Sequence, residues 1–451
     1  MSASQRPAWG LEMNLRKKYI RFILPSIASM WAFSLYTMVD GIFVARGVGE
    51  TALAAVNLSM PFTSFVFMLG VLLATGTSTL ISIALGRGDL EHARDLFNQN
   101  LAVTGIVSLV ISVLVLLFKR QVALFLGATP DTLSYVEEYV GTIALFALFF
   151  TISYNLEVQV KANGAPQVST LGVLSCGLMN VALDALFVLV FHWGVWGAAL
   201  ATGLAQVTST LVFLVYFLTH RDRLRFDRFH PRLNLYRRIV PLGLSEGLGE
   251  MSNGLVVFFF NRTILQVIGE QALPTYTVIS YVNTLVLMTM TGTAQGMQPL
   301  ISFSLGANKR YECHKLLKYG LVSVALFGAV SFSLAQAGAP LLVSAFLEAD
   351  SAIFPYTVKA LRMYACSFLV MGFNVVFAGF LTAMNRPAPA FAISFGRSLV
   401  LLVSSLAVMS YFFGDQGLWY ATLVSECVCL VLASGCGIHY FRSLPTRDNG
   451  Q

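Results

Sequence analysis

Long apolar runs, separated by short polar segments, follow one another along almost the whole chain. A helix that crosses a bilayer needs about 20 predominantly apolar residues. The strands of a transmembrane barrel would instead alternate apolar and polar positions over about 10 residues, and runs such as residues 101–118 do not alternate. We therefore predict transmembrane helices. The twelve expected spans cover residues 19–45, 51–84, 101–118, 135–160, 168–192, 195–219, 239–267, 272–304, 319–347, 356–384, 388–413 and 417–441.

The composition supports a chain that lies mostly in lipid. Charged residues make up only 11% of the 451 residues, whereas a soluble domain carries roughly 25%. The 29 basic and 22 acidic residues are too few to cover a soluble protein of this size. The basic residues flank apolar runs and form no domain of their own. The pattern argues against a soluble enzyme, a nucleic-acid-binding protein and a disordered scaffold.

Lysine and arginine indicate the orientation. With the N-terminus on the cytoplasmic side, 22 of the 29 basic residues fall in cytoplasmic segments, as the positive-inside rule requires. The first span lacks a signal-peptide cleavage pattern and contains Asp40, which favours a retained helix. We therefore expect a multi-pass protein of the plasma (inner) membrane with both termini cytoplasmic.

The two halves of the chain repeat one another. A basic cytoplasmic linker, residues 221–238, separates an N-lobe (residues 1–220) from a C-lobe (residues 239–451). Six spans per half is an even number, so both halves insert the same way round and form a parallel repeat. This predicts an all-α integral membrane fold: two six-helix lobes related by a pseudo-two-fold axis, as in alternating-access transporters. A duplication without a transport role is the alternative. The matching segments, offset by about 220 residues, are 48–50 with 268–270, 84–87 with 304–307, 162–166 with 384–389, and 194–196 with 417–419; Pro25 also matches Pro241.

Ionisable residues inside spans are functional candidates because they are costly in lipid. Asp40 lies in the first span and Asp184 in the fifth, with Asn180 four residues earlier on the same helix face. One carboxylate with an amide oxygen suits Na⁺, and it equally suits a carboxyl group that takes up and releases a proton. Two nearby buried carboxyl groups raise each other's pKa and can therefore titrate near neutral pH. Thr202 in the sixth span is positioned to add an oxygen. The alternative is a buried aspartate that only holds helices together.

The C-lobe carries a second set of acids. Glu246 and Glu250 lie four residues apart, just after Pro241, and form either a cation-attracting surface or a second coupling site. A solvated position near the cytoplasmic end is the alternative for Glu246. For Glu426 a packing role is equally open, and Arg262 fits a snorkelling anchor.

Motifs for other functions are missing from the sequence. The chain has no phosphate loop of the ATP-driven pumps, no H-E-x-x-H and no G-x-S-x-G. The six cysteines show no metal-binding spacing. We expect no catalytic residues and no cofactor other than H⁺ or Na⁺ as the coupling ion.

The chain resembles the multidrug and toxic compound extrusion (MATE) transporters, prokaryotic type, over nearly its whole length. The resemblance rests on the first helix from Pro25 to Asp40 and on segments 49–58, 161–166, 180–184 and 194–199, together with the loop at Gly86 and the mid-chain basic linker. It implies a V-shaped antiporter that exports cationic amphiphilic compounds in exchange for H⁺ or Na⁺.

The resemblance also implies roles for single residues. Asp40, Asp184, Asn180 and Thr202 match the cation or proton site of the prokaryotic relatives, with Na⁺ placed at Asp40, Asn180 and Asp184. Pro25 matches a helix-bending proline. Tyr36, Tyr139 and Asn155 match polar neighbours of that site less closely, and we assign them to the substrate cavity. Glu246 and Glu250 lie near an acid that another branch uses in its seventh helix, and neither matches it cleanly. We assign both of them to the substrate cavity as well.

The sequence leaves alternatives to an exporter, including a non-transporting receptor, which no residue pattern supports. A lipid-linked oligosaccharide or lipid flippase of the same superfamily would carry a basic cavity for pyrophosphate, whereas the charges within these spans are mainly acidic. An integral-membrane enzyme such as a prenyl transferase would need a D-x-x-x-D motif, which is absent. The expected partners are small cationic or amphiphilic molecules and the lipid bilayer, with no nucleic acid, and the expected functional unit is a monomer.

Overall fold

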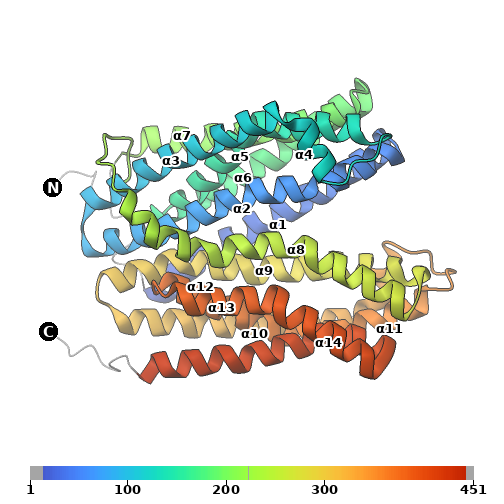
Figure 1. The fold of residues 1–451 in the computed structure, drawn as a ribbon. Helices are drawn as coiled ribbons and strands as arrows, with labels where there is room; N and C mark the ends of the chain where they lie inside the picture. Colours follow the sequence, from blue (N-terminus) through green and yellow to red (C-terminus); the bar gives the residue numbers. More distant parts are fainter. Residues whose placement is uncertain (1–13, 222, 443–451) are drawn as a thin grey trace.

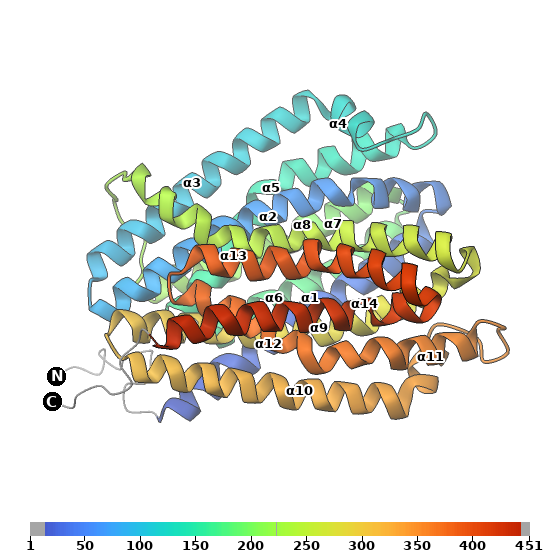
Figure 2. The ribbon, with the colours of Figure 1, turned by 60° about the horizontal axis from the view of Figure 1, so that its bottom comes forward.

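The computed structural model describes residues 14–221 and 223–442, and in these residues every regular element is helical. The helices form twelve long rods that run roughly along one direction (Figure 1). The predicted all-α fold and its twelve spans are thereby confirmed. The start of α1 and the end of α14 lie at the same end of the bundle, which we call the basic end (Figures 1 and 2).

The first half of the chain supplies six of these rods. The fifth continues from α6 into a π-helical turn, η2, directly after Asp184. The elements are α1 (Leu15–Gly47), α2 (Glu50–Arg87), α3 (Leu90–Leu117), the short α4 (Lys119–Phe125), α5 (Leu133–Ala162), α6 (Pro166–Asp184), η2 (Ala185–Val190) and α7 (Gly194–Thr219).

The second half supplies the other six rods. Two of them are composite, because α11 runs through η5 into α12, and α13 runs through a π-helical turn, η6, into α14. Gly414, with φ at 59°, breaks α14 and separates the last two spans. The elements are η3 (Leu233–Leu235), α8 (Tyr236–Val267), η4 (Glu270–Ala272), α9 (Leu273–Gly306), α10 (Arg310–Ser344), α11 (Phe354–Tyr364), η5 (Ala365–Ser367), α12 (Phe368–Ala383), α13 (Pro387–Phe395), η6 (Gly396–Val400) and α14 (Leu401–Arg442).

Most of the rods are apolar enough to cross a membrane. Within the described residues, nine helical segments meet this criterion by length and composition, and one of them, Pro387–Gly435, contains both spans of α13–α14. The remaining rods are α8 and α9. Both carry polar side chains that line the cavity between the lobes, described below, and these side chains lower the hydropathy of the two helices.

The two lobes meet through helices related by the repeat. In Figure 1, α1–α7 form one layer and α9–α14 the other, with α8 along the seam between them. Helix α1 packs against α9, and α2 packs against α8 and α9. Because α8 and α9 are the repeat partners of α1 and α2, these contacts are related by the same pseudo-two-fold axis.

Glycines make this seam tight at the basic end. A Cβ on Gly86 of α2 would overlap the carbonyl oxygen of Phe303 on α9, and a Cβ on Gly306 would overlap that of Ile83. Gly86 and Gly306 are 220 residues apart, and so are Ile83 and Phe303, so the two contacts are equivalent in the two repeats. The pseudo-two-fold axis therefore passes between α2 and α9 at this point, and only glycine allows the backbones to approach so closely.

The same reciprocity recurs deeper in the bundle. Gly243 of α8 meets the backbone of Leu72 on α2, whereas Gly292 of α9 meets the backbone of Ile27 on α1. These contacts join α2 to α8 and α1 to α9 at equivalent positions of the two repeats. The lobes are thus held together by backbone packing in the halves of α2 and α9 that approach the basic end.

The basic linker lies against α3. The Asn98 amide donates to the carbonyl oxygen of Arg225 at 2.9 Å and accepts from the N–H of Asp227 at 3.2 Å, and Gln99 makes the same paired contact with the backbone of Arg232. The Arg225 guanidinium donates to Asp227 and lowers the pKa of that exposed carboxyl. The linker is therefore fixed to the N-lobe by its backbone, and its exposed charges contribute little to that attachment.

Replacing Gly86 with alanine tests the tight seam. Alanine in a helix interior is ordinarily more stable than glycine by roughly 0.5–1 kcal/mol. For Gly86→Ala we expect the opposite sign, a loss of about 1–3 kcal/mol, because the new Cβ meets backbone that cannot move aside. The measurement is the apparent Tm of the purified protein in detergent. Gly338→Ala in α10, where nothing lies within 4 Å of the added Cβ, is the matched control. A Tm for Gly86→Ala at or above that of Gly338→Ala would contradict the seam.

Candidate functional site

Asp40 and Asp184 come together inside the N-lobe. Asp40 lies on α1, and Asp184 is the last residue of α6, directly before the π-helical turn. The two carboxyl groups lie within hydrogen-bonding range of each other. Asp184 is completely buried, and neither of its oxygens accepts a hydrogen bond from an N–H or O–H of the described residues. A proton shared by the pair, or a bound cation, would satisfy these oxygens.

Asn180 and Thr202 complete this cluster. The Asn180 amide donates to the Thr202 hydroxyl at 3.5 Å, and the hydroxyl donates to the carbonyl oxygen of Ala198 at 3.0 Å. The Asn180 side-chain oxygen is buried and has no donor. Tyr139 is buried next to both aspartates. Among the described residues no group of three or more His, Cys, Asp or Glu could hold a metal, so any cation here would rest on two carboxylates and neutral oxygens.

A central cavity lies between the lobes. It contains about 1340 Å³ of space free of protein atoms, part of it open to solvent. Of the residues that we assigned to the substrate cavity, Tyr36, Glu246 and Glu250 line it. Tyr139 and Asn155 are not in its wall; Tyr139 lies beside the aspartate pair, and Asn155 is buried and donates to Thr104 at 3.1 Å.

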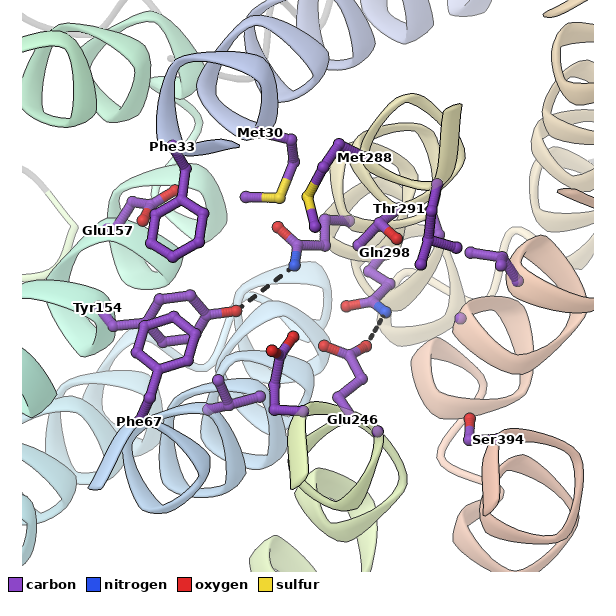
Figure 3. Close-up of a pocket in the computed structure, with 18 of the residues that line it drawn as sticks. Met30, Phe33, Phe67, Tyr154, Glu157, Glu246, Met288, Thr291, Gln298 and Ser394 are labelled. Carbon is purple, nitrogen blue, oxygen red and sulfur yellow. Dashed lines mark hydrogen bonds between the residues drawn. The ribbon is translucent and has the colours of Figure 1, made fainter. Parts of the chain in front are cut away.

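The N-lobe wall of the cavity is aromatic. Phe33 stacks on Phe67 with ring centroids 5.7 Å apart, and Tyr36 and Tyr154 meet these two rings edge to face at 5.4 and 5.0 Å. Figure 3 shows Met30 and Met288 beside this wall. Flat rings with flexible thioethers form a surface that adapts to apolar molecules of different shapes.

The floor of the cavity is polar and joins the two lobes. Glu246 of α8 accepts a hydrogen bond from Gln298 of α9 (Figure 3) and another, at 3.1 Å, from Thr75 of α2. Gln295 of α9 contacts the N-lobe in the same region, where it donates to the Tyr154 hydroxyl at 3.4 Å and accepts from the Lys161 ammonium at 3.4 Å. Glu246 is therefore bound within the protein and is not simply solvated.

Lys161 differs from what its position in the sequence suggested. It is one of the 22 basic residues that the sequence pattern predicts in cytoplasmic segments, but it is only 2% exposed. Its ammonium group pairs with Glu157 at 2.8 Å, and Ser169 donates to the same carboxylate at 3.0 Å. A spacing of four residues puts Glu157 and Lys161 on one helix face, which is the signal that identifies this pair from sequence.

A second buried ion pair lies in the C-lobe. Arg397, in the π-helical turn η6, donates to Glu426 of α14 at 2.9 Å, and Asn374 of α12 donates to the other carboxylate oxygen at 2.7 Å. Arg397 also lines the central cavity. Glu426 is thus fully partnered, whereas Arg262 is exposed on α8. Nothing in the sequence connects residues 374, 397 and 426.

Pro25 lies within α1, opposite α6. Its carbonyl oxygen accepts from the hydroxyl of Thr170 on α6 at 2.7 Å and from that of Ser29 at 3.0 Å. A proline removes one helical hydrogen bond and permits a bend. The helix that carries Asp40 is therefore tied, at its weak point, to the helix that carries Asp184.

The buried pair in the C-lobe gives a test by double-mutant cycle. Arg397→Gln leaves the Glu426 charge buried beside an amide, and removal of one partner of a buried ion pair costs about 3–5 kcal/mol. Glu426→Gln together with Arg397→Gln removes both charges, and we expect most of that stability to return. The measurement is the apparent Tm of both single variants and the double variant. Additive losses in the double variant would show that the two charges do not interact.

Comparisons with known proteins agree with this architecture. The family model MatE matches residues 25–186 and 250–407. The multidrug export protein MepA of Staphylococcus haemolyticus is 27% identical over 429 residues, which cover 94% of this chain and 93% of that protein. MepA of Staphylococcus aureus is 26% identical over 441 residues and 96% of each chain.

Solved structures share the fold. One described as MATE in complex with MaL6 has a TM-score of 0.92, with 21% identity over 97% of this chain and 99% of that chain. One described as an outward-facing multidrug resistance MATE transporter of the MOP superfamily has a TM-score of 0.91, with 20% identity over 98% and 99%. The family model, which matches most of the chain, and these relatives lead to one conclusion: the protein is a multi-pass membrane protein that belongs to the MatE family of multidrug and toxic compound extrusion transporters.

Proposed function

We propose that this protein is a secondary active multidrug efflux antiporter of the plasma (inner) membrane. It exports cationic amphiphilic compounds in exchange for H⁺ or Na⁺ by alternating access of two lobes, residues 1–220 and 239–451. The observation that carries the proposal is the Asp40–Asp184 pair, whose buried oxygens are left without donors close to a large cavity. The relatives named as multidrug export proteins support the same activity.

The cavity has the chemistry to bind cations with apolar bodies. Its aromatic and methionine wall supplies apolar contact and π faces that attract cations. Among its carboxylates, Glu157 is neutralised by Lys161, whereas Glu246 and Glu250 form no ion pair in the described part of the chain. Arg397 reaches the cavity but is paired with Glu426. The cavity is therefore negative on balance, which disfavours a flippase that must hold pyrophosphate.

Ion entry can drive substrate export only if the ion binds one state of the transporter more tightly than the other. The seam between the lobes is tight at the basic end, so the cavity opens toward the other end. With both termini cytoplasmic, this arrangement faces outward. A proton or Na⁺ that binds between α1 and α6 changes how these helices pack, and it shifts the equilibrium only as far as it prefers one state over the other. Pro25 is the point at which α1 can bend in response.

Neutralising either aspartate should uncouple transport. For Asp40→Asn and Asp184→Asn we expect gradient-driven efflux of a fluorescent cation from proteoliposomes to fall to the level of protein-free vesicles, because neither amide can exchange a proton or balance Na⁺. Asp131→Asn, an exposed position of the α4–α5 connection, is the matched control and should transport normally. Normal efflux by both site variants would refute the coupling site.

The coupling ion is identified by imposing one gradient at a time. Efflux driven by a pH gradient in Na⁺-free buffer assigns H⁺, and efflux driven by a Na⁺ gradient at equal pH assigns Na⁺. The two carboxylates and the unpartnered Asn180 oxygen are suited to either ion. Efflux that requires ATP and neither gradient would contradict secondary active transport.

Glu250 provides a test of cation selectivity. Its carboxylate lines the cavity and forms no ion pair with any described residue. For Glu250→Gln we expect a several-fold higher KM for a dicationic substrate and a smaller change for a monocationic substrate of similar size, since one charge interaction is lost per site. Glu348→Gln, on the exposed segment before α11, serves as the control. Equal changes for both substrates would mean that Glu250 does not act through its charge.

A further inference from the structure

A second hollow lies at the basic end, on the seam between the lobes. It encloses about 1120 Å³ of space, partly open to solvent. Three arginines line it: Arg87 at the end of α2, Arg310 at the start of α10 and Arg386 directly before α13. Arg87 belongs to the N-lobe and the other two to the C-lobe. Among the described residues, no acidic side chain is part of the wall.

The positions of two of these arginines are electrostatically unfavourable. The N-terminal end of a helix carries partial positive charge, so anions are stabilising there and cations are not. Arg310 opens the 35-residue helix α10, and Arg386 is the cap residue of α13, whose first turn contains no acid. Two cationic side chains and two helix dipoles therefore direct positive charge at one hollow.

Two of the acids close in sequence, Glu312 and Asp89, form hydrogen bonds with other groups, and a third, Glu91, is exposed in the first turn of α3. Glu312 accepts from Lys309 at 3.1 Å and from Ser304 at 3.2 Å. Asp89 caps α3 by accepting the N–H of His92 at 3.0 Å. Within the described residues no ion pair involves the side chain of Arg87 or Arg310.

The two repeats differ in charge at these positions, so the cluster of three arginines is not duplicated by the repeat. With the offsets that relate the halves, the counterparts of Arg87, Arg310 and Arg386 are Ala307, Leu90 and Gly164, and none of these is charged. The positive-inside rule accounts for arginines on this side of the membrane. The rule does not explain why three arginines surround this one hollow while their counterparts in the repeat are uncharged.

We infer that this hollow is a binding site for a phosphate-bearing anion. Guanidinium groups recognise phosphate by paired, charge-assisted hydrogen bonds. The apolar side chains of Ile83, Leu305 and Met384 in the same wall suit the apolar part of a lipid that carries such a phosphate. The anion joins Arg87 of one lobe to Arg310 and Arg386 of the other. It therefore stabilises the arrangement in which the basic end is closed.

Binding is tested with purified full-length protein in a neutral detergent. The probes are short-chain phosphatidylglycerol, short-chain phosphatidylcholine as the zwitterionic reference without net charge, and inorganic phosphate. The readouts are the bound mass in native mass spectrometry and the apparent Tm. We expect phosphatidylglycerol, phosphate or both to bind and raise Tm in the wild type. Stabilisation by phosphatidylglycerol alone identifies a lipid as the source, and stabilisation by phosphate identifies a soluble anion.

The variants separate this site from general charge attraction. Arg87→Gln, Arg310→Gln and Arg386→Gln combined should weaken binding by more than about tenfold, since a single charge-assisted hydrogen bond is already worth about that factor. The control replaces Arg221, Arg228 and Arg237, exposed linker arginines at the same end, and removes the same charge. If the triple variant fails to fold, Arg310→Gln alone should show a partial loss. Wild-type affinity in the site variants, or equal loss in the control, overturns the proposal.

Discussion

A charge buried in a membrane protein must find a partner, and this constraint divides the ionisable residues of the chain into two kinds. Glu157 with Lys161, and Glu426 with Arg397 and Asn374, are satisfied within the protein. Asp40 and Asp184 face each other with oxygens that have no donor. A shared proton or a bound cation would satisfy these oxygens. Under the proposed function the incomplete pair is the one that exchanges an ion, and the complete pairs are part of the framework that holds it.

The framework depends equally on the absence of side chains. The carbonyl groups of Phe303 and Ile83 occupy the space where Cβ atoms of Gly86 and Gly306 would lie. In lipid, close backbone packing replaces the hydrophobic drive that joins helices in water. Because these contacts are reciprocal across the pseudo-two-fold axis, each lobe offers the other the same surface. The seam can then close at the basic end while a cavity remains at the level of Glu246.

Much of this architecture is predictable because its causes are local in the sequence. Twelve apolar runs, basic loops and an offset of 220 residues predict the helical rods and the parallel repeat, and a spacing of four residues puts Asn180 and Asp184 on one face. Other features depend on packing between distant segments. The burial of Lys161, the π-helical turns beside Asp184 and at Arg397, and the contact of Arg397 with Glu426 arise from tertiary structure. From the sequence, Lys161 is predicted to be an exposed loop residue because it lies at the end of an apolar run, in the last turn of α5. Its burial depends on helices that follow later in the chain.

The polar floor of the cavity contains hydrogen bonds that join the two lobes, next to the proposed substrate site. Thr75 donates to Glu246 across the lobes, and Gln295 contacts both Tyr154 and Lys161. These hydrogen bonds must break before the basic end can open. A cationic substrate that draws the Glu246 carboxylate toward itself competes with the Thr75 hydroxyl for the same oxygen. In the proposed outward-facing arrangement, substrate in the cavity would therefore weaken a contact that keeps the lobes closed at the basic end, whereas a cation bound between Asp40 and Asp184 would act on the packing of α1 against α6. An exchange reaction requires that both ligands be coupled through one change of state, and the two proposed sites would act on different helix contacts that this change involves.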